Sequence, residues 1–115
     1  MKKDYKVAVV IRTMDRLGFA ESTQGTQYIR DAVDIASGQY RTMMCKDVYP
    51  AIAKKYGITP AAAERAIRTA IDCAQHSPVW AFHWKEIGGW GQPSNSEVIM
   101  RLLREARYFE DGLSD

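Results

Sequence analysis

The sequence lacks the long apolar runs and the cysteine content that mark membrane and secreted proteins. Charged residues interrupt every apolar run well before the roughly 20 residues that a membrane span needs. The first sixteen residues, MKKDYKVAVVIRTMDR, carry no signal-peptide cleavage pattern. Cys45 and Cys73 are the only cysteines. Both fall in apolar helical patterns, so we expect buried, reduced thiols in a cytoplasmic protein.

The residue sets of common catalytic and metal sites are also missing. No Ser/His/Asp set and no pair of carboxylates stands out, and the glycine-rich residues 88–91 match no phosphate-loop pattern. A zinc site would have to combine Cys73 and His76 with Cys45 and His83, which lack the close spacing of a second ligand pair. We therefore expect no enzyme, no metal and no cofactor.

The chain does contain enough apolar sequence for one packed domain. Of its 115 residues, 46% are hydrophobic, and no repeat or low-complexity linker divides them. We therefore predict a single domain over residues 1–115. Helical apolar spacing, with glycine stops and Ser/Thr-Pro starts, predicts six helices. Their approximate ranges are 4–17, 26–37, 42–56, 59–75, 78–87 and 94–109, followed by a polar tail, EDGLSD, that we expect to fray.

Several of these predictions rest on particular residues. VAVVI in the first segment is β-branched and could form a strand, but the wider spacing favours a helix. Pro50 lies inside the third helical pattern, so that helix is either bent there or restarted with Pro50 in its first turn. Met43 and Met44 are interpreted as core filler. Trp80 and Trp84 have the spacing of core residues, with base stacking as the weaker alternative.

The most informative stretch is residues 47–74, DVYPAIAKKYGITPAAAERAIRTAIDCA. Ala53 is small enough to let a second helix approach closely. Gly57 can take the left-handed conformation that ends a helix. Thr59 then suits the N-cap of the next helix, with Pro60 at its first position. This pattern predicts a helix-turn-helix, whose second helix reads the DNA major groove.

The two faces of that second helix support the interpretation. One face carries small and apolar residues, whereas Glu64, Arg65, Arg68 and Thr69 fall on the other. Arg65 and Arg68 are neighbours on the helix surface and suit base edges and phosphates. Residues 41–68 hold six basic and two acidic side chains, against ten and twelve elsewhere. The positive charge is therefore concentrated on this unit. The alternative is a solvated helix with ordinary surface arginines.

Longer motifs resemble the C-terminal DNA-binding domain of the sporulation master response regulator of spore-forming bacteria. The resemblance covers about residues 7–108 and rests on motifs in matching order and spacing. These are Tyr49-Pro50 with Ile52-Ala53-Lys54-Lys55, then Glu64-Arg65-Ala66-Ile67-Arg68 with Ala70-Ile71, and finally Pro93 with Asn95-Ser96-Glu97. It implies an all-α, compact six-helix domain of the helix-turn-helix, winged-helix-like superfamily. Such a domain binds double-stranded promoter DNA and reads a TGNCGAA-type box through the helix at residues 59–75.

The resemblance also implies which side chains touch DNA. Glu64, Arg65 and Arg68 would read bases or face the groove. The remaining contacts would come from Thr69, Lys54, Lys55, Gln92, Ser94 and Asn95, although the two lysines could instead be merely solvated. The chain departs from the family in three places. Gln92 replaces a basic residue, Thr69 replaces a histidine, and the reading helix starts with Ala61-Ala62-Ala63 instead of a more polar segment.

The resemblance leaves regulation and partners open. Family members carry an upstream receiver domain, which these 115 residues do not contain, so the chain is either an excised domain or a stand-alone relative. Met1-Lys2-Lys3 favours the second interpretation. Tandem boxes imply a homodimer on DNA, and the RNA polymerase sigma subunit is a further expected partner. The alternative function is a helical interaction module that binds polymerase or antagonises a full-length relative. Gln92 and the alanine-rich helix start offer few groups that bind phosphate, and this motivates the alternative function.

Overall fold

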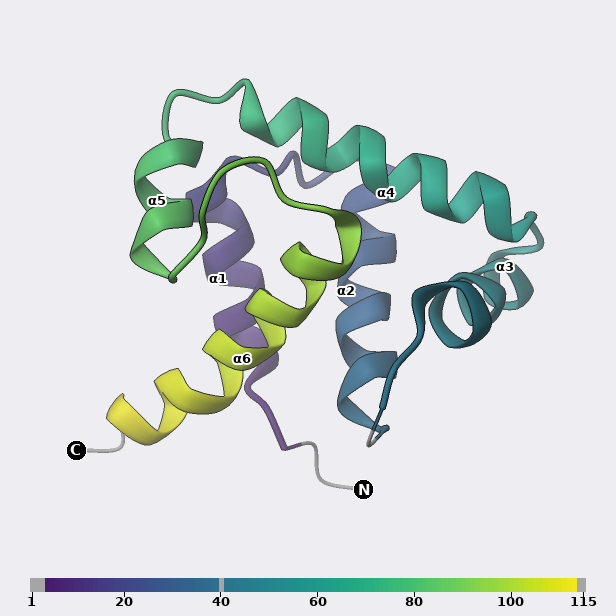
Figure 1. Ribbon diagram of the computed structural model, residues 1–115, viewed down its shortest axis with the longest axis horizontal. Coiled ribbons are helices and arrows are strands. Elements are labelled where there is room, and N and C mark those ends of the chain that lie inside the picture. The colour runs from purple at the N-terminus through teal and green to yellow at the C-terminus, as the bar shows by residue number, and fades with distance from the viewer. Residues whose placement is uncertain (1–3, 40, 114–115) are drawn as a thin grey trace.

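Helical periodicity of the apolar residues accounts for the elements of the fold. The computed structural model describes residues 4–39 and 41–113, which form six α-helices and no strand (Figure 1). This confirms the all-α, six-helix prediction. The helices are α1 (Val7–Leu17), α2 (Gln24–Ser37), α3 (Tyr49–Tyr56), α4 (Pro60–Gln75), α5 (Trp80–Glu86) and α6 (Asn95–Leu113), with a π-helical turn at Met44–Val48 before α3.

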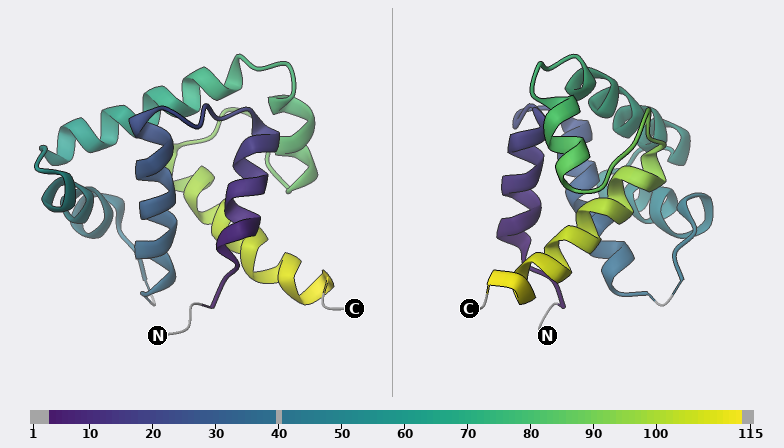
Figure 2. Two further views of the ribbon diagram at one scale, coloured as in Figure 1. Left: turned by 180° about the vertical axis from the view of Figure 1, so that it is seen from behind. Right: turned by 60° about the vertical axis from the view of Figure 1, so that its left-hand side comes forward.

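Helix α4 lies across one end of the domain, with α3 near its start and α5 near its end (Figure 1). Helix α1 runs toward this end and α2 runs away from it, and α6 packs against both of them (Figure 2). The start of α1 and the end of α6 lie at the opposite end of the domain. The outer face of α4 is therefore left uncovered by the other helices. Across the described residues, no helix combines the length and the apolar character needed to cross a membrane.

One apolar core holds the helices together, and its members are mostly those that the spacing predicts. Trp80 and Trp84 are only 6% and 4% exposed and stack with their ring centroids 5.3 Å apart, which confirms their role in the core. Helix α4 buries one narrow stripe, namely Ala63, Ile67, Ala70, Ile71 and Ala74. Helix α6 buries Val98, Ile99, Leu102, Leu103 and Ala106. The predicted apolar faces of both helices are therefore confirmed, apart from Ala66, which is only partly buried.

The closest helix contact joins α2 to α4. Gly25 is buried, and a Cβ atom there would lie 2.2 Å from the backbone oxygen of Ala66 and 2.7 Å from the Cβ atom of Ala70. Small residues on both helices let the two backbones approach this closely. The contact therefore fixes how far α4 lies from the centre of the domain.

The structure corrects three expectations about single side chains and decides between the two alternatives for a fourth residue. Met43 is 53% exposed because the chain is still extended there, one residue before the π-helical turn begins. Cys45 and Cys73 are both exposed, since neither lies on the buried side of its helix. The expectation of buried thiols was therefore wrong. At Pro50 the chain follows the second alternative, because α3 restarts there with the proline in its first turn.

Several helix boundaries also differ from the prediction, since α1 begins at Val7 and α3 at Tyr49, both later than expected. Helix α2 begins at Gln24, so the loop before it is shorter than expected. Helix α6 continues to Leu113 through most of the segment that we expected to fray. The final two residues of that segment, and the proposed natural start at Met1–Lys3, lie outside the described residues.

The α2–α4 contact leads to a stability prediction. Changing Gly25→Ala should lower the free energy of unfolding by about 1–3 kcal/mol, because the new methyl group meets backbone that has no room to shift. Urea unfolding followed by circular dichroism measures this change. Gly38→Ala is the matched control, since a Cβ atom there would meet only ordinary contact at 3.7 Å. Equal stability of the two variants would contradict the packing argument.

Candidate nucleic-acid interface

The predicted helix-turn-helix is present and consists of α3, a short turn and α4. Gly57 ends α3 in the left-handed conformation, with φ 68°, and the Ile58 amide donates back to the Ala53 carbonyl. Thr59 is then extended, and its side-chain oxygen accepts a hydrogen bond from the Ala62 amide at 3.0 Å. Pro60 occupies the first turn of α4. The capping and turn residues predicted from the sequence therefore set the angle between the two helices.

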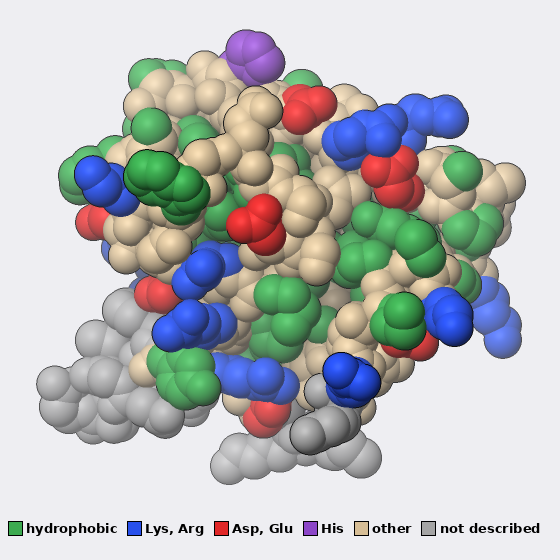
Figure 3. All heavy atoms as spheres, viewed as in Figure 1, with side chains coloured by type: hydrophobic (Ala, Val, Ile, Leu, Met, Phe, Trp, Pro, Cys, Tyr) green, Lys and Arg blue, Asp and Glu red, His purple; other side chains and the backbone are tan. Residues whose placement is uncertain are grey.

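The outer face of α4 carries the side chains that were expected to read DNA. Arg65, Arg68 and Thr69 are exposed, and Glu64 is partly buried. Figure 3 shows basic and acidic side chains side by side on the upper right of the molecule, where α4 runs. The structure thus brings these four residues onto one surface, as the helical spacing predicts.

Arg68 and Glu64 form an ion pair on this surface. Nη1 of Arg68 donates to both carboxylate oxygens of Glu64, at 3.0 and 2.8 Å. The two side chains are four residues apart on the same helix face, and such pairs stabilise a helix by only a few tenths of a kcal/mol. Their main effect here is geometric, because the carboxylate holds the guanidinium in one orientation. The Nε and Nη2 donors of Arg68 are not used by this pair.

The two adjacent lysines of α3 differ in their surroundings. Lys55 donates to the Asp31 carboxylate of α2 at 3.0 Å and lies 5.3 Å from the centre of the Tyr56 ring. The hydrogen bond with Asp31, and then the charge of that carboxylate, raise the pKa of Lys55. Tyr56 also donates a hydrogen bond to Asp31. Lys54 is exposed, and no ion pair holds it within the described part of the chain.

The three residues expected to contact DNA from the segment around the start of α6 all make bonds within the protein. Gln92 donates to the Gln75 side chain at 3.0 Å. Ser94 and Glu97 form a capping box, since each side chain accepts from the backbone amide of the other at 3.1 Å. Asn95 donates from Nδ2 to the Tyr49 hydroxyl at 3.0 Å and to the Glu64 carbonyl at 3.3 Å. The Ser-x-x-Glu spacing of residues 94–97 is typical of a capping box, but no local pattern indicates the bonds of Asn95.

A shallow groove of about 380 Å³ runs beside the exposed face of α4. Arg65 and Thr69 line it from α4, and the chain before and at the start of α2 forms the other wall. The sequence analysis missed this groove. The sequence does contain a signal for the groove. Alanines at 62, 66 and 70 repeat every four residues, so one edge of α4 carries only small side chains.

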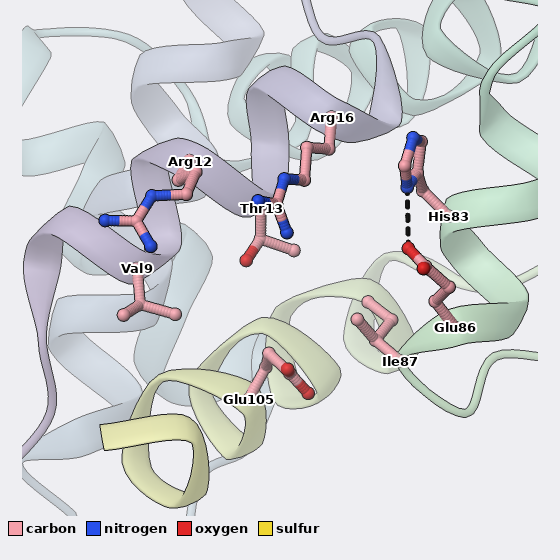
Figure 4. Close-up of a pocket in the computed structure, with 8 residues that line it drawn as sticks. All are labelled: Val9, Arg12, Thr13, Arg16, His83, Glu86, Ile87 and Glu105. Atoms are coloured by element: carbon pink, nitrogen blue, oxygen red, sulfur yellow. Dashed lines mark hydrogen bonds and ion pairs between the residues drawn. The ribbon is translucent and has the colours of Figure 1, made fainter. Parts of the chain in front are cut away.

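A second depression, of about 220 Å³, lies between α1, α5 and α6 (Figure 4). Arg12 and Arg16 line it from α1, whereas Glu86 and Glu105 line it from α5 and α6. His83 Nδ1 is 2.7 Å from a Glu86 carboxylate oxygen. None of the residues expected to bind DNA contributes to this depression, so it is separate from the α4 surface.

Comparison with known families gives one match. A family model described as the C terminal of the sporulation initiation factor Spo0A matches residues 10–106. The match covers most of the core, the helix-turn-helix and the capping box of α6. It confirms the resemblance that the motifs at residues 49–97 indicated.

The N-cap of α4 gives a prediction for the start of the reading helix. Thr59→Ala should lower the free energy of unfolding by about 1 kcal/mol, because the Ala62 amide loses its side-chain acceptor. Thermal unfolding by calorimetry measures the loss. Thr69→Ala makes the same chemical change at an exposed site inside α4 and should be neutral or slightly stabilising. A comparable loss in both variants would argue against the cap.

Proposed function

Because the chain belongs to the Spo0A C-terminal family of sporulation initiation factors, we propose that it reads a TGNCGAA-type promoter box through α4. The family is one of DNA-binding regulators of sporulation transcription, and the chain is such a DNA-binding domain. The observation that carries the finer proposal is the exposed arginine pair, Arg65 and Arg68, on the second helix of a capped helix-turn-helix. Helices in this position enter the major groove.

Each side chain of the reading face has a chemical role in this proposal. A guanidinium donates two parallel hydrogen bonds to O6 and N7 of guanine, which suits Arg65 and Arg68. Glu64 accepts from N4 of cytosine or orients Arg68, and its ion pair with Arg68 supports the second role. Thr69, one residue beyond Arg68, offers a methyl group and a hydroxyl to the groove.

The contacts to the DNA backbone are fewer than the family motifs suggest. We assign one to Lys54, which is exposed, and none to Lys55, which is held by Asp31. Gln92 carries no charge and is bonded to Gln75. We therefore expect weaker binding to phosphate and a shifted box preference, as the alanines at the start of α4 also suggest.

The exposed aromatic residues favour protein partners in addition to DNA. Phe82 on α5 and Trp90 just after it are 64% and 86% exposed. They support the proposals of a homodimer on tandem boxes and of contact with the RNA polymerase sigma subunit. They also favour the alternative function, an interaction module without strong DNA binding. Titration with box-containing and scrambled duplexes separates the two functions, because only a DNA reader binds in a salt-dependent way and prefers the box.

The reading arginines give the first binding prediction. Arg65→Ala and Arg68→Ala should each weaken binding to the box duplex by about 1–3 kcal/mol, because a paired contact to a base is lost. Binding to a scrambled duplex should change much less. Fluorescence anisotropy at one fixed salt concentration measures both. Arg104→Ala, which removes the same charge from α6, is the control. Unchanged box affinity in both variants would show that α4 does not read the bases.

The two lysines give the second binding prediction. Lys54→Ala should weaken binding to box and scrambled duplexes alike and lower the slope of log affinity against log salt by about one unit. Lys55→Ala should leave the slope nearly unchanged, because Asp31 already holds that ammonium group. The two variants have the same net charge and lie side by side, so each serves as the control for the other. Equal slopes would contradict the separate roles.

A further inference from the structure

Asn95 connects the reading helix to two other helices. It is the first residue of α6, and its amide nitrogen reaches the Glu64 carbonyl of α4 and the Tyr49 hydroxyl of α3. A backbone carbonyl only accepts hydrogen bonds, so the carbonyl of Glu64 fixes which end of the amide faces α4. The two N–H groups of the amide then serve one acceptor each. One side chain thus joins both helices of the helix-turn-helix to α6.

The surroundings of Asn95 hold it in place from both sides. The capping box of Ser94 and Glu97 fixes the backbone at the start of α6. Tyr49 is 7% exposed, and its burial raises the pKa of the phenol, so the hydroxyl remains a neutral partner. The third partner, Glu64, is the residue whose carboxylate holds Arg68. A chain of bonded groups therefore runs from the start of α6 to the guanidinium on the reading face.

We propose that Asn95 is a positioning residue, which sets the place of the Glu64–Arg68 turn by bridging it to Tyr49 and α6 and does not itself contact DNA. This inference rests on the proposed reading of DNA through α4. Positioning residues of this kind matter because a displacement of the order of an ångström breaks paired hydrogen bonds to a base. Both amide hydrogens of the partly buried Asn95 side chain are in use, so this side chain has no free donor for a phosphate.

A double-mutant cycle tests how Asn95 acts. Asn95→Ala should weaken box binding about tenfold in the wild-type background, a size typical of coupled neighbours. In an Arg68→Ala background the same change should have little further effect, because the group that it positions is absent. Tyr49→Phe, at a site that DNA cannot touch, should weaken box binding in the same direction. Binding to a scrambled duplex should remain within about twofold in every variant, the error expected for independent sites.

The double-mutant cycle has a matched control, and three outcomes would contradict the proposals. Ser96→Ala lies next to Asn95 in the first turn of α6, is exposed and should leave box binding unchanged. An equal loss from Asn95→Ala with and without Arg68 would show a direct DNA contact and overturn the proposal. An equal loss on box and scrambled duplexes would show a general effect on the fold and would also overturn it. A wild-type protein that does not prefer the box would instead reject the proposed function.

Hydrogen exchange without DNA tests the positioning separately from the function. In Asn95→Ala, the backbone amides of residues 64–68 should exchange about tenfold faster, because that turn loses the hydrogen bond that its Glu64 carbonyl accepts from Asn95. The amides of α1 should exchange as in the wild type. Ser96→Ala should change neither region. Uniform acceleration across the chain, or no change at residues 64–68, would overturn the positioning role whether or not the protein binds the box.

Discussion

The narrow contact between α2 and α4 is the constraint on which the rest of the structure depends. Gly25 leaves no space for even one added methyl group against the backbone of Ala66. A helix pressed this closely can bury only small side chains and a few isoleucines along one edge. Its remaining faces must then point outward, and this places Arg65 and Arg68 in solvent at the uncovered end of the domain. The groove beside α4 has the same cause, because the small residues that allow the approach also leave its rim without bulk.

Ion pairs within the protein determine which of the basic side chains remain available to bind an anionic partner. The sequence places six basic residues between 41 and 68, but charge counting treats them as equal. In the structure, Lys55 forms an ion pair with Asp31, and Arg68 forms one with Glu64. Lys54 and Arg65 form no ion pair among the described residues. The surface with unpaired positive charge is therefore narrower than the charge count suggests. In the proposed function, the orientation of a few donors matters more for specificity than total charge.

The features that could be predicted from the sequence are those that depend on residues close together in the chain. Turn and cap residues such as Gly57 and Thr59 act within four positions, so their roles could be read from spacing alone, and the family motifs identified the fold. Exposure of Met43, Cys45 and Cys73 could not be predicted, because an irregular turn and the exact rotation of a helix decide it. The bridge from Asn95 to Tyr49 spans 46 residues and depends on how three helices dock. No local pattern encodes such a contact, although its endpoints lie in two of the three motifs that resemble the family.

The position of Asn95 within a family motif suggests a structural role for the motif at residues 93–97. Interpreted from the resemblance, Ser94 and Asn95 belong to a segment that contacts DNA. In the structure, Ser94 and Glu97 instead fix the first turn of α6, and Asn95 uses the fixed position to reach both helices of the reading unit. The bridge therefore uses the capped turn of Ser94 and Glu97 and the amide of Asn95 between them. In the proposed role of Asn95, this motif holds α4 in place, and DNA recognition depends on it through the position of Arg68.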